Sequence, residues 1–401
     1  MVNKVKTAVM VQAAKPERLI ALDIIRGFFL LVIMIDHVEM YPSIFDLVTG
    51  RGRMYVSAAE GFFFMSGMLV GLVYRRRLAR GMKFIFGKMW RRALELYIAS
   101  IFFTLLYTWL ALHFNHPDIK DGLYTVTNWP HIFKETVLMR YGYGWADFLD
   151  RFAILMFLAP FAFYLITKGR WWLLAIISAV AWAFRGNGFT LSWQIIFASA
   201  MIIGYYWYDI RARWDSLAAK AKLRLKQSVL ALTIITGAMS WASVFILSLL
   251  NERLSSLPAS LQSFTHGWNS FNAWIWLYDQ KWTIGPIRIV LFLLWFSALF
   301  MLVNRYQKPI SRVTKGVVET VGRNSLFVYV THSIIVFGLR LLINTTGQAL
   351  WVNFLVTAGG LAVLVAITLT YVRFMPPREE RAKIMAQIKR GLLARPASAE
   401  S

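Results

Sequence analysis

Arg26 and His37, two ionisable residues within one apolar segment, are the first candidates for chemistry. Eleven residues, or about three turns of an α-helix, separate them, so both side chains would lie on nearly one face, about 16 Å apart along the axis. A charge at the centre of a membrane helix costs about 2.5–3.5 kcal/mol, so a spanning helix that keeps one is usually using it. The pair therefore indicates a pathway through the membrane that is lined by polar side chains. The structural alternative is that Arg26 snorkels and pairs with Asp23, while His37 bonds a backbone carbonyl.

A carboxylate in the next apolar segment could serve the histidine. Glu60 lies near the start of the stretch SAAEGFFFMSG, residues 57–67, at a depth similar to that of His37. We expect Glu60 to bind His37, fix its tautomer and raise its basicity, as a general base requires. Asp36 would point about 100° away from His37 and is a poor partner for it, but it remains a candidate catalytic acid. Ser66 and Gly67 suit close helix packing.

A basic stretch, residues 75–92, follows this second segment. The planar guanidinium group of arginine binds phosphate through two parallel hydrogen bonds. The stretch therefore predicts a cytoplasmic site for the phosphates of a nucleotide-like ligand, unless its cations only set topology and contact lipid headgroups. The candidate anion ligands are Arg76, Arg77, Arg80, Arg91 and Arg92.

Two polar clusters precede later apolar segments. They either form salt-bridged helix starts, since an acid complements the dipole at a helix N-terminus, or line a cleft for an acceptor substrate. The clusters are Asp147, Asp150 and Arg151, and Asp279, Lys281 and Arg288. His332, in a further apolar segment, is expected to be a packing histidine.

The two long segments 113–148 and 251–283 are expected to be polar, aromatic outer loops. Tryptophan in such a place anchors a protein at the membrane interface, which is the interpretation we favour, or offers a stacking platform for sugars. The tryptophans concerned are Trp129, Trp145, Trp268, Trp274, Trp276 and Trp282.

The elements that must position these residues are membrane helices. The 401-residue chain is 58% hydrophobic and 16% charged, and it has no cysteine. Soluble domains carry roughly 25% charged residues, so the composition predicts an all-α, polytopic integral membrane protein. We expect ten spanning helices, near residues 19–39, 54–74, 92–112, 149–167, 171–185, 191–209, 228–250, 284–304, 324–346 and 350–374. The fifth is short for a span.

Lysine and arginine support this count and its orientation. With the N-terminus inside, they favour the cytoplasmic segments by about three to one, which predicts cytoplasmic termini. The same bias explains the net charge of +24 without a nucleic-acid partner. The expected organisation is a cytoplasmic tail over residues 1–17, a transmembrane domain over 18–374 and a cytoplasmic tail over 375–401.

Several motifs, in order along residues 18–374, resemble the OpgC family. They are RG-x9-DH, AAEGFFFMSG, DFLDRFAILMFLAP, SWQIIFA, DQKWTIGPIRIVLFL and GRNSLFVYVTH. The resemblance implies an inner-membrane enzyme that succinylates osmoregulated periplasmic glucans, within the wider acyltransferase-3 superfamily. It implies that His37 is the catalytic base, that Arg26 contacts the carrier of the acyl donor and that Glu60 is a family acid. The R-x-x-R motif of the superfamily is incomplete here, since the segment reads KMWR from Lys88 and RALE from Arg92.

We therefore predict an O-acyltransferase that moves a succinyl group from cytoplasmic succinyl-CoA to hydroxyls of a periplasmic glucan, with no metal and no tightly bound cofactor. The expected partners are the glucan, the coenzyme A thioester and the bilayer, and the oligomeric state stays open, a homodimer included. One alternative is an acyltransferase for another surface polysaccharide or lipid. The other is a proton-coupled transporter or flippase that uses Arg26, Glu60 and His37 as a relay, although matching half-chain repeats are not found.

Overall fold

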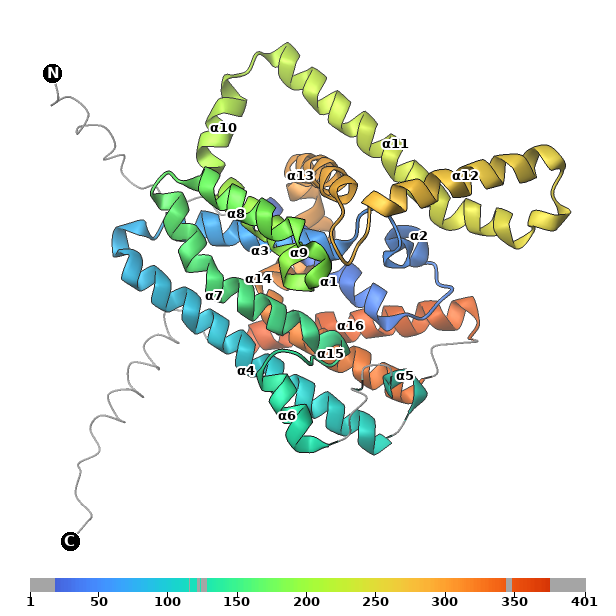
Figure 1. Cartoon of the computed structure of the whole chain (residues 1–401), viewed down its shortest axis with the longest axis horizontal. Helices are drawn as coiled ribbons and strands as arrows, with labels where there is room; N and C mark the ends of the chain where they lie inside the picture. Colours follow the sequence, from blue (N-terminus) through green and yellow to red (C-terminus); the bar gives the residue numbers. More distant parts are fainter. Residues whose placement is uncertain (1–18, 115, 121–122, 124–127, 344–347, 376–401) are drawn as a thin grey trace, which may run out of the picture.

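The structure is a computed structural model that describes residues 19–114, 116–120, 123, 128–343 and 348–375. This part of the chain is helical and contains no strand (Figure 1). The predicted tail 1–17, and 375–401 apart from its first residue, lie outside the described residues. The α-helices are α1 Ile20–Val38, α2 Asp46–Thr49, α3 Ala58–Arg75, α4 Met82–Phe114, α5 Pro117–Lys120, α6 Trp129–Val137, α7 Asp147–Thr167, α8 Trp171–Ala183, α9 Phe189–Tyr205, α10 Trp207–Ser216, α11 Ala219–Glu252, α12 Ala259–Tyr278, α13 Pro286–Val313, α14 Val317–Arg323, α15 Ser325–Leu342 and α16 Leu350–Phe374.

A helix lies at each of the ten predicted ranges. Six described helices are long and apolar enough to cross a membrane, namely α4, α7, α11, α13, α15 and α16. A seventh is found if α9 and α10, which meet at a bend of 65°, count as one span. The α1 helix fails this test of composition because it carries the three charged residues Asp23, Arg26 and Asp36. The α8 helix, at the fifth predicted span, has only 13 residues, so this span is as short as predicted.

The two segments predicted to be outer loops contain helices, none of which is among the described helices apolar enough to cross a membrane. Within 113–148 lies α6, and within 251–283 lies the 20-residue α12. The sequence of α12 resembles that of a loop because polar and aromatic residues are mixed in it. In the structure most of these residues are exposed. Figure 1 shows α11 and α12 at the edge of the view and α1, α3 and α9 near its middle.

Glycines bring the central helices into close contact. A Cβ atom on Gly67 of α3 would lie 2.2 Å from the carbonyl oxygen of Phe197 in α9, so the two backbones touch there. The predicted packing role of Gly67 is thereby confirmed. At the start of α1, a Cβ on Gly322 of α14 would lie 1.9 Å from the carbonyl oxygen of Asp23. This contact joins the start of α1 to α14. A hydrogen bond between His37 and His332 joins the end of α1 to α15.

The contact at Gly322 leads to a stability prediction. We expect Gly322→Ala to cost about 1–3 kcal/mol, because the added methyl group forces α14 away from the α1 backbone. The control is Gly338→Ala in α15, where no atom lies within 4 Å of the added Cβ and alanine favours the helix. Thermal unfolding of the two detergent-purified proteins is the measurement. Equal melting temperatures would contradict the close contact.

Candidate active site

His37, in the last turn of α1, forms a hydrogen bond with a second histidine. Its Nδ1 lies 3.0 Å from Nε2 of His332 in α15, and the two rings stack with centroids 5.2 Å apart. His332 is 1% exposed, so it is part of the protein interior. His332 is thus a buried, hydrogen-bonded histidine, as predicted, but its pairing with His37 was not expected.

The partners of His332 determine the protonation of both rings. Its Nδ1 contacts the backbone carbonyl oxygen of Tyr329, which can only accept, so Nδ1 carries a proton. A neutral His332 then has its lone pair on Nε2, and Nδ1–H of His37 donates to it. The remaining nitrogen of a neutral His37, Nε2, is thus unprotonated. The pair leaves His37 with the free lone pair that a general base needs.

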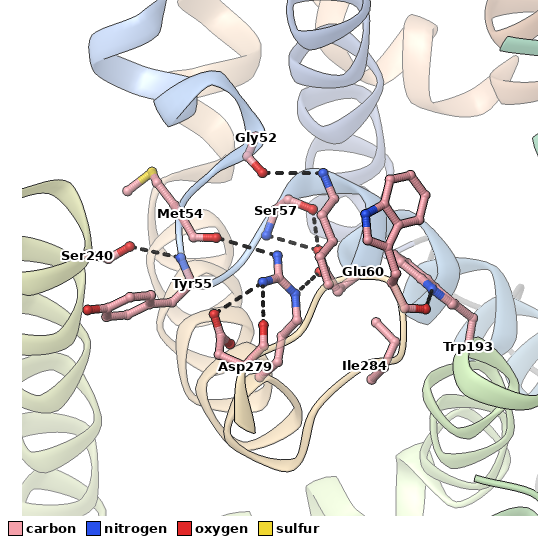
Figure 2. Close-up of polar contacts among 12 residues, drawn as sticks. Gly52, Met54, Tyr55, Ser57, Glu60, Trp193, Ser240, Asp279 and Ile284 are labelled. Carbon is pink, nitrogen blue, oxygen red and sulfur yellow. Dashed lines mark hydrogen bonds and ion pairs between the residues drawn. The ribbon is translucent and has the colours of Figure 1, made fainter. Parts of the chain in front are cut away.

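Glu60 does not bind His37, so the predicted His37–Glu60 pair is wrong. The Glu60 carboxylate is fully buried in the first turn of α3, where Oε2 accepts a 2.9 Å hydrogen bond from the backbone N–H of Ser57. Oε1 accepts from Arg288 of α13, which also donates to Asp279 Oδ2 at 3.3 Å (Figure 2). The local capping box and this cation satisfy the carboxylate, so Glu60 joins α3 to α13 instead of orienting the imidazole.

Arg288 is a structural cation in this arrangement. It is 2% exposed and donates to Glu60, to Asp279 and, at 3.5 Å, to the carbonyl oxygen of Met54. Burial raises the pKa of the Asp279 carboxyl to about 7 despite the attraction of Arg288. Glu60 is therefore the stronger partner. Of the two interpretations left open for this cluster, the salt-bridged helix start describes Arg288 and Asp279.

The loop between α12 and α13 is held in place from several sides. The indole N–H of Trp193 donates to the Trp282 carbonyl oxygen at 3.2 Å, and that of Trp182 to the Ile284 carbonyl oxygen at 2.8 Å. Figure 2 shows Trp193 and Ile284 on the side of the loop away from Tyr55. Together with Arg288, these bonds fix the position of Lys281 within the loop.

Lys281 lies beside Asp36 and near His37. Its Nζ donates to the Gly52 carbonyl oxygen at 3.3 Å. A Cβ built on Gly52 would lie 3.3 Å from Lys281 Nζ and 3.5 Å from Asp36 Oδ2, so both charged groups face the same small residue. Asp36 precedes His37 in the chain, which places Lys281 close to the histidine. Asp36 has a buried Oδ1 without a hydrogen-bond partner in the described part of the chain.

Arg340 of α15 binds the backbone of His37. Its Nη2 donates to the His37 carbonyl oxygen at 3.0 Å, and the guanidinium forms an ion pair with Glu39. The same group lies 4.8 Å from the ring centroid of Trp145. Of the two cations near His37, Arg340 is paired with Glu39, whereas Lys281 bonds a neutral carbonyl, so Lys281 is the one that favours an anionic ligand group.

Arg26 does not form the predicted ion pair with Asp23. Asp23 binds Arg323 of α14 at 3.4 Å instead. The Arg26 guanidinium lies 5.6 Å from the ring centroid of Phe62, and its buried Nε has no hydrogen-bond partner among the described residues. A buried cation with an unused donor can hold an anionic or carbonyl group of a ligand.

The first polar cluster both starts a helix and lines a pocket. Arg151 binds Asp147 one turn earlier at 2.6 Å, as the salt-bridged helix start predicts. These two residues and the buried Asp150 line a pocket of about 520 Å³ between the start of α7, the start of α9 and residues 139–142. The two interpretations left open for this cluster are therefore compatible.

The comparison with protein families decides what kind of protein carries this site. The family model described as OpgC protein matches residues 18–375, nearly the whole chain. The chain belongs to the OpgC family. No curated protein and no solved structure shows a significant match to it. OpgC membership and the apolar helices together indicate a multi-pass membrane protein with an acyltransferase-like function.

The basic stretch of this OpgC protein runs from the end of α3 into α4, and its arginines contact nearby side chains. Arg91 and Arg92 bind Glu95 at 3.2 and 3.3 Å. Arg76, Arg77 and Arg80 lie over the rings of Tyr208, Tyr74 and Phe84, respectively. Since these partners are weak or exposed, the predicted binding of phosphates by the five arginines stays a prediction.

Sequence reasoning missed two members of the site. His332 was noted within the GRNSLFVYVTH segment, and a histidine in an apolar helix requires a polar partner, which is the signal that could have paired it with His37. Arg340 carries the same signal in the same helix. Neither partner can be assigned from spacing, because 295 residues separate the two histidines.

Proposed function

We propose that this OpgC protein is an inner-membrane O-acyltransferase that transfers a succinyl group from cytoplasmic succinyl-CoA to hydroxyls of a periplasmic glucan. In this proposal the chain has ten spanning helices, with α1, α3, α8 and α9 joining the six long apolar ones, and both termini lie in the cytoplasm. The observation that carries the proposal is the pairing of His37 with His332, which leaves His37 Nε2 free as a base.

The proposed reaction uses His37 as base and then as acid. The oxygen of an acceptor hydroxyl attacks the thioester carbonyl carbon, and its proton passes to His37 Nε2. The carbon–sulfur bond then breaks, and the departing thiolate takes this proton from the imidazolium. An ester and free coenzyme A result. His332 accepts from His37 Nδ1 throughout, which keeps the ring in one orientation.

Arg26 supports a donor route from the cytoplasmic side. It lies three helical turns before His37, at about the reach of an extended pantetheine arm, and has an unused buried donor. In the proposal, the phosphates of the donor contact the basic stretch 75–92, the arm passes Arg26 and the thioester arrives at His37. The acceptor approaches from the opposite side in this proposal.

The reaction is tested with protein in nanodiscs, labelled succinyl-CoA and purified periplasmic glucan. We expect label to enter the glucan as an ester that mild base releases. Transfer of label to another polysaccharide or to a lipid, but not to glucan, would show that the proposed acceptor is wrong. If the protein has no affinity for coenzyme A, and liposomes that contain it take up substrate together with protons, the protein is a transporter and not an enzyme.

Lys281 is expected to select the succinyl group. Among the described residues its ammonium makes one hydrogen bond, to the neutral carbonyl group of Gly52, and in this proposal it also binds the distal carboxylate of the donor. A hydrogen bond to a charged group contributes about 1.5–3 kcal/mol, so Lys281→Met should lower kcat/KM for succinyl-CoA about 10- to 100-fold. The value for acetyl-CoA should change little. The control is Lys134→Met on exposed α6, and equal losses for both donors would rule out this role.

A further inference from the structure

The pocket at the start of α7 is polar and lies at the same end of the molecule as His37. Three segments form it: residues 139–142, the first two turns of α7 and residues 187–191. Its volume of about 520 Å³ is in the range of small-molecule sites. Trp193 of α9 binds the loop that carries Lys281, and Lys281 binds Gly52 beside Asp36. These links connect the pocket to the outer end of α1.

We propose that this pocket binds one sugar unit of an oligosaccharide acceptor, next to the unit whose hydroxyl reacts at His37. The inference rests on the proposed function, because it names how the acceptor of that reaction is held.

The lining favours a neutral polyol. Asp150 is 8% exposed, and its buried Oδ1 has no hydrogen-bond partner in the part of the chain that the structure describes. A carboxylate oxygen in this state accepts hydroxyl protons. The charges of Asp147 and Arg151 compensate each other at 2.6 Å, and Arg140, the other cation of the lining, lies 4.0 Å from Glu135. With the Asp150 carboxylate added, these side chains have no excess of positive charge that would favour a phosphate.

The remaining polar groups complete a surface for hydroxyl groups. The Arg151 guanidinium lies 3.7 Å from the ring centroid of Phe189, which holds the cation flat against one wall. Asn187 is exposed and Thr190 partly exposed, so an amide and a hydroxyl are offered from the α9 side. Carboxylate, guanidinium, amide and hydroxyl together match the mixed donors and acceptors of a sugar.

The position of the pocket excludes a direct reaction within it. The Phe148 ring, next to Asp147 in the chain, stacks on the Tyr329 ring at 5.0 Å, and the Tyr329 ring meets that of His332 at 4.7 Å. Tyr329 is 2% exposed and donates to the Trp145 carbonyl oxygen, so this aromatic layer is fixed. A sugar in the pocket is separated from His37 by these rings. The reacting hydroxyl must belong to a neighbouring unit of the same chain.

The test measures binding of glucose oligomers, one to six units long, to the full-length protein in nanodiscs without any acyl donor. We expect the affinity to rise when the oligomer becomes long enough to fill both positions. Asp150→Asn should remove this gain, with a loss of about 10- to 100-fold for the long oligomers and little for glucose. The matched control, Glu252→Gln at the exposed end of α11, should bind as the wild type does.

A second variant keeps the test decisive if Asp150→Asn does not fold. Asn187→Ala changes an exposed side chain and should weaken the long oligomers about threefold to tenfold, as the loss of one or two neutral hydrogen bonds predicts. If both variants bind long oligomers as the wild type does, or if inorganic phosphate binds better than any oligomer, the subsite is refuted even where acyl transfer is found. Binding that depends on length and on Asp150, without acyl transfer, supports the subsite and refutes the proposed reaction.

Discussion

Replacing His37 by alanine is expected to lower the rate of acyl transfer by about 10²- to 10⁴-fold, which is the usual contribution of a positioned general base. The alanine removes Nε2, the nitrogen that the His332 hydrogen bond leaves unprotonated. His37 is only partly buried, and its substitution removes no ion pair. The protein should therefore stay folded and still bind coenzyme A. The measurement is the single-turnover rate of label transfer at saturating donor.

His332 provides an internal check on this result. Because it acts through His37, the double variant His37→Ala/His332→Ala should lose no more activity than His37→Ala alone. His266→Ala, which removes an exposed histidine of α12, is the matched control and should be fully active. A His37→Ala protein with wild-type activity would exclude His37 as the base.

The second large effect concerns stability. Arg288→Met should destabilise the protein by about 3–5 kcal/mol, because it leaves the buried Glu60 carboxylate without its cation. Adding Glu60→Gln should recover most of this loss, since the remaining acid, Asp279, has a pKa raised by burial to about 7 and can become neutral. The measurement is the thermal unfolding, in detergent, of the wild type, of Arg288→Met and of the double variant Arg288→Met/Glu60→Gln.

Arg253→Met, at an exposed arginine after α11, is the control for Arg288→Met and should be within about 0.5 kcal/mol of the wild type. If the Arg288→Met protein melts together with this control, Arg288 is not the clamp between α3 and α13. If the double variant is no more stable than Arg288→Met, the loss comes from packing and not from an unpaired carboxylate.

The positions of most helices can be predicted from the sequence because apolar runs are local features. The segment around Phe62 and Gly67 is an example, since both its helix and its close packing follow from composition and spacing. The α12 helix is the exception, because its exposed aromatic and polar residues lack the apolar run of a span. The apolar character of a helix also does not by itself decide whether a helix with several charges, such as α1, crosses the membrane.

The partners of the buried charges could not be predicted in the same way. The sequence predicts similar depths for Glu60 and His37, so a pair between them is the simplest assumption. Each instead finds a partner far along the chain, Arg288 at a separation of 228 residues and His332 at 295. Buried polar groups must be satisfied, but which group satisfies them depends on the helix neighbours. The residue types of the site were therefore predictable, whereas its pairs required the three-dimensional arrangement.

The most direct test of the central claim is a structure determined with a non-hydrolysable succinyl-CoA analogue bound. The account predicts that the analogue's arm passes Arg26, that its acyl carbonyl carbon lies next to His37 Nε2 and that His37 Nδ1 stays bonded to His332. An analogue bound away from α1, or a His37 whose Nε2 is bonded to protein in the complex, would contradict it.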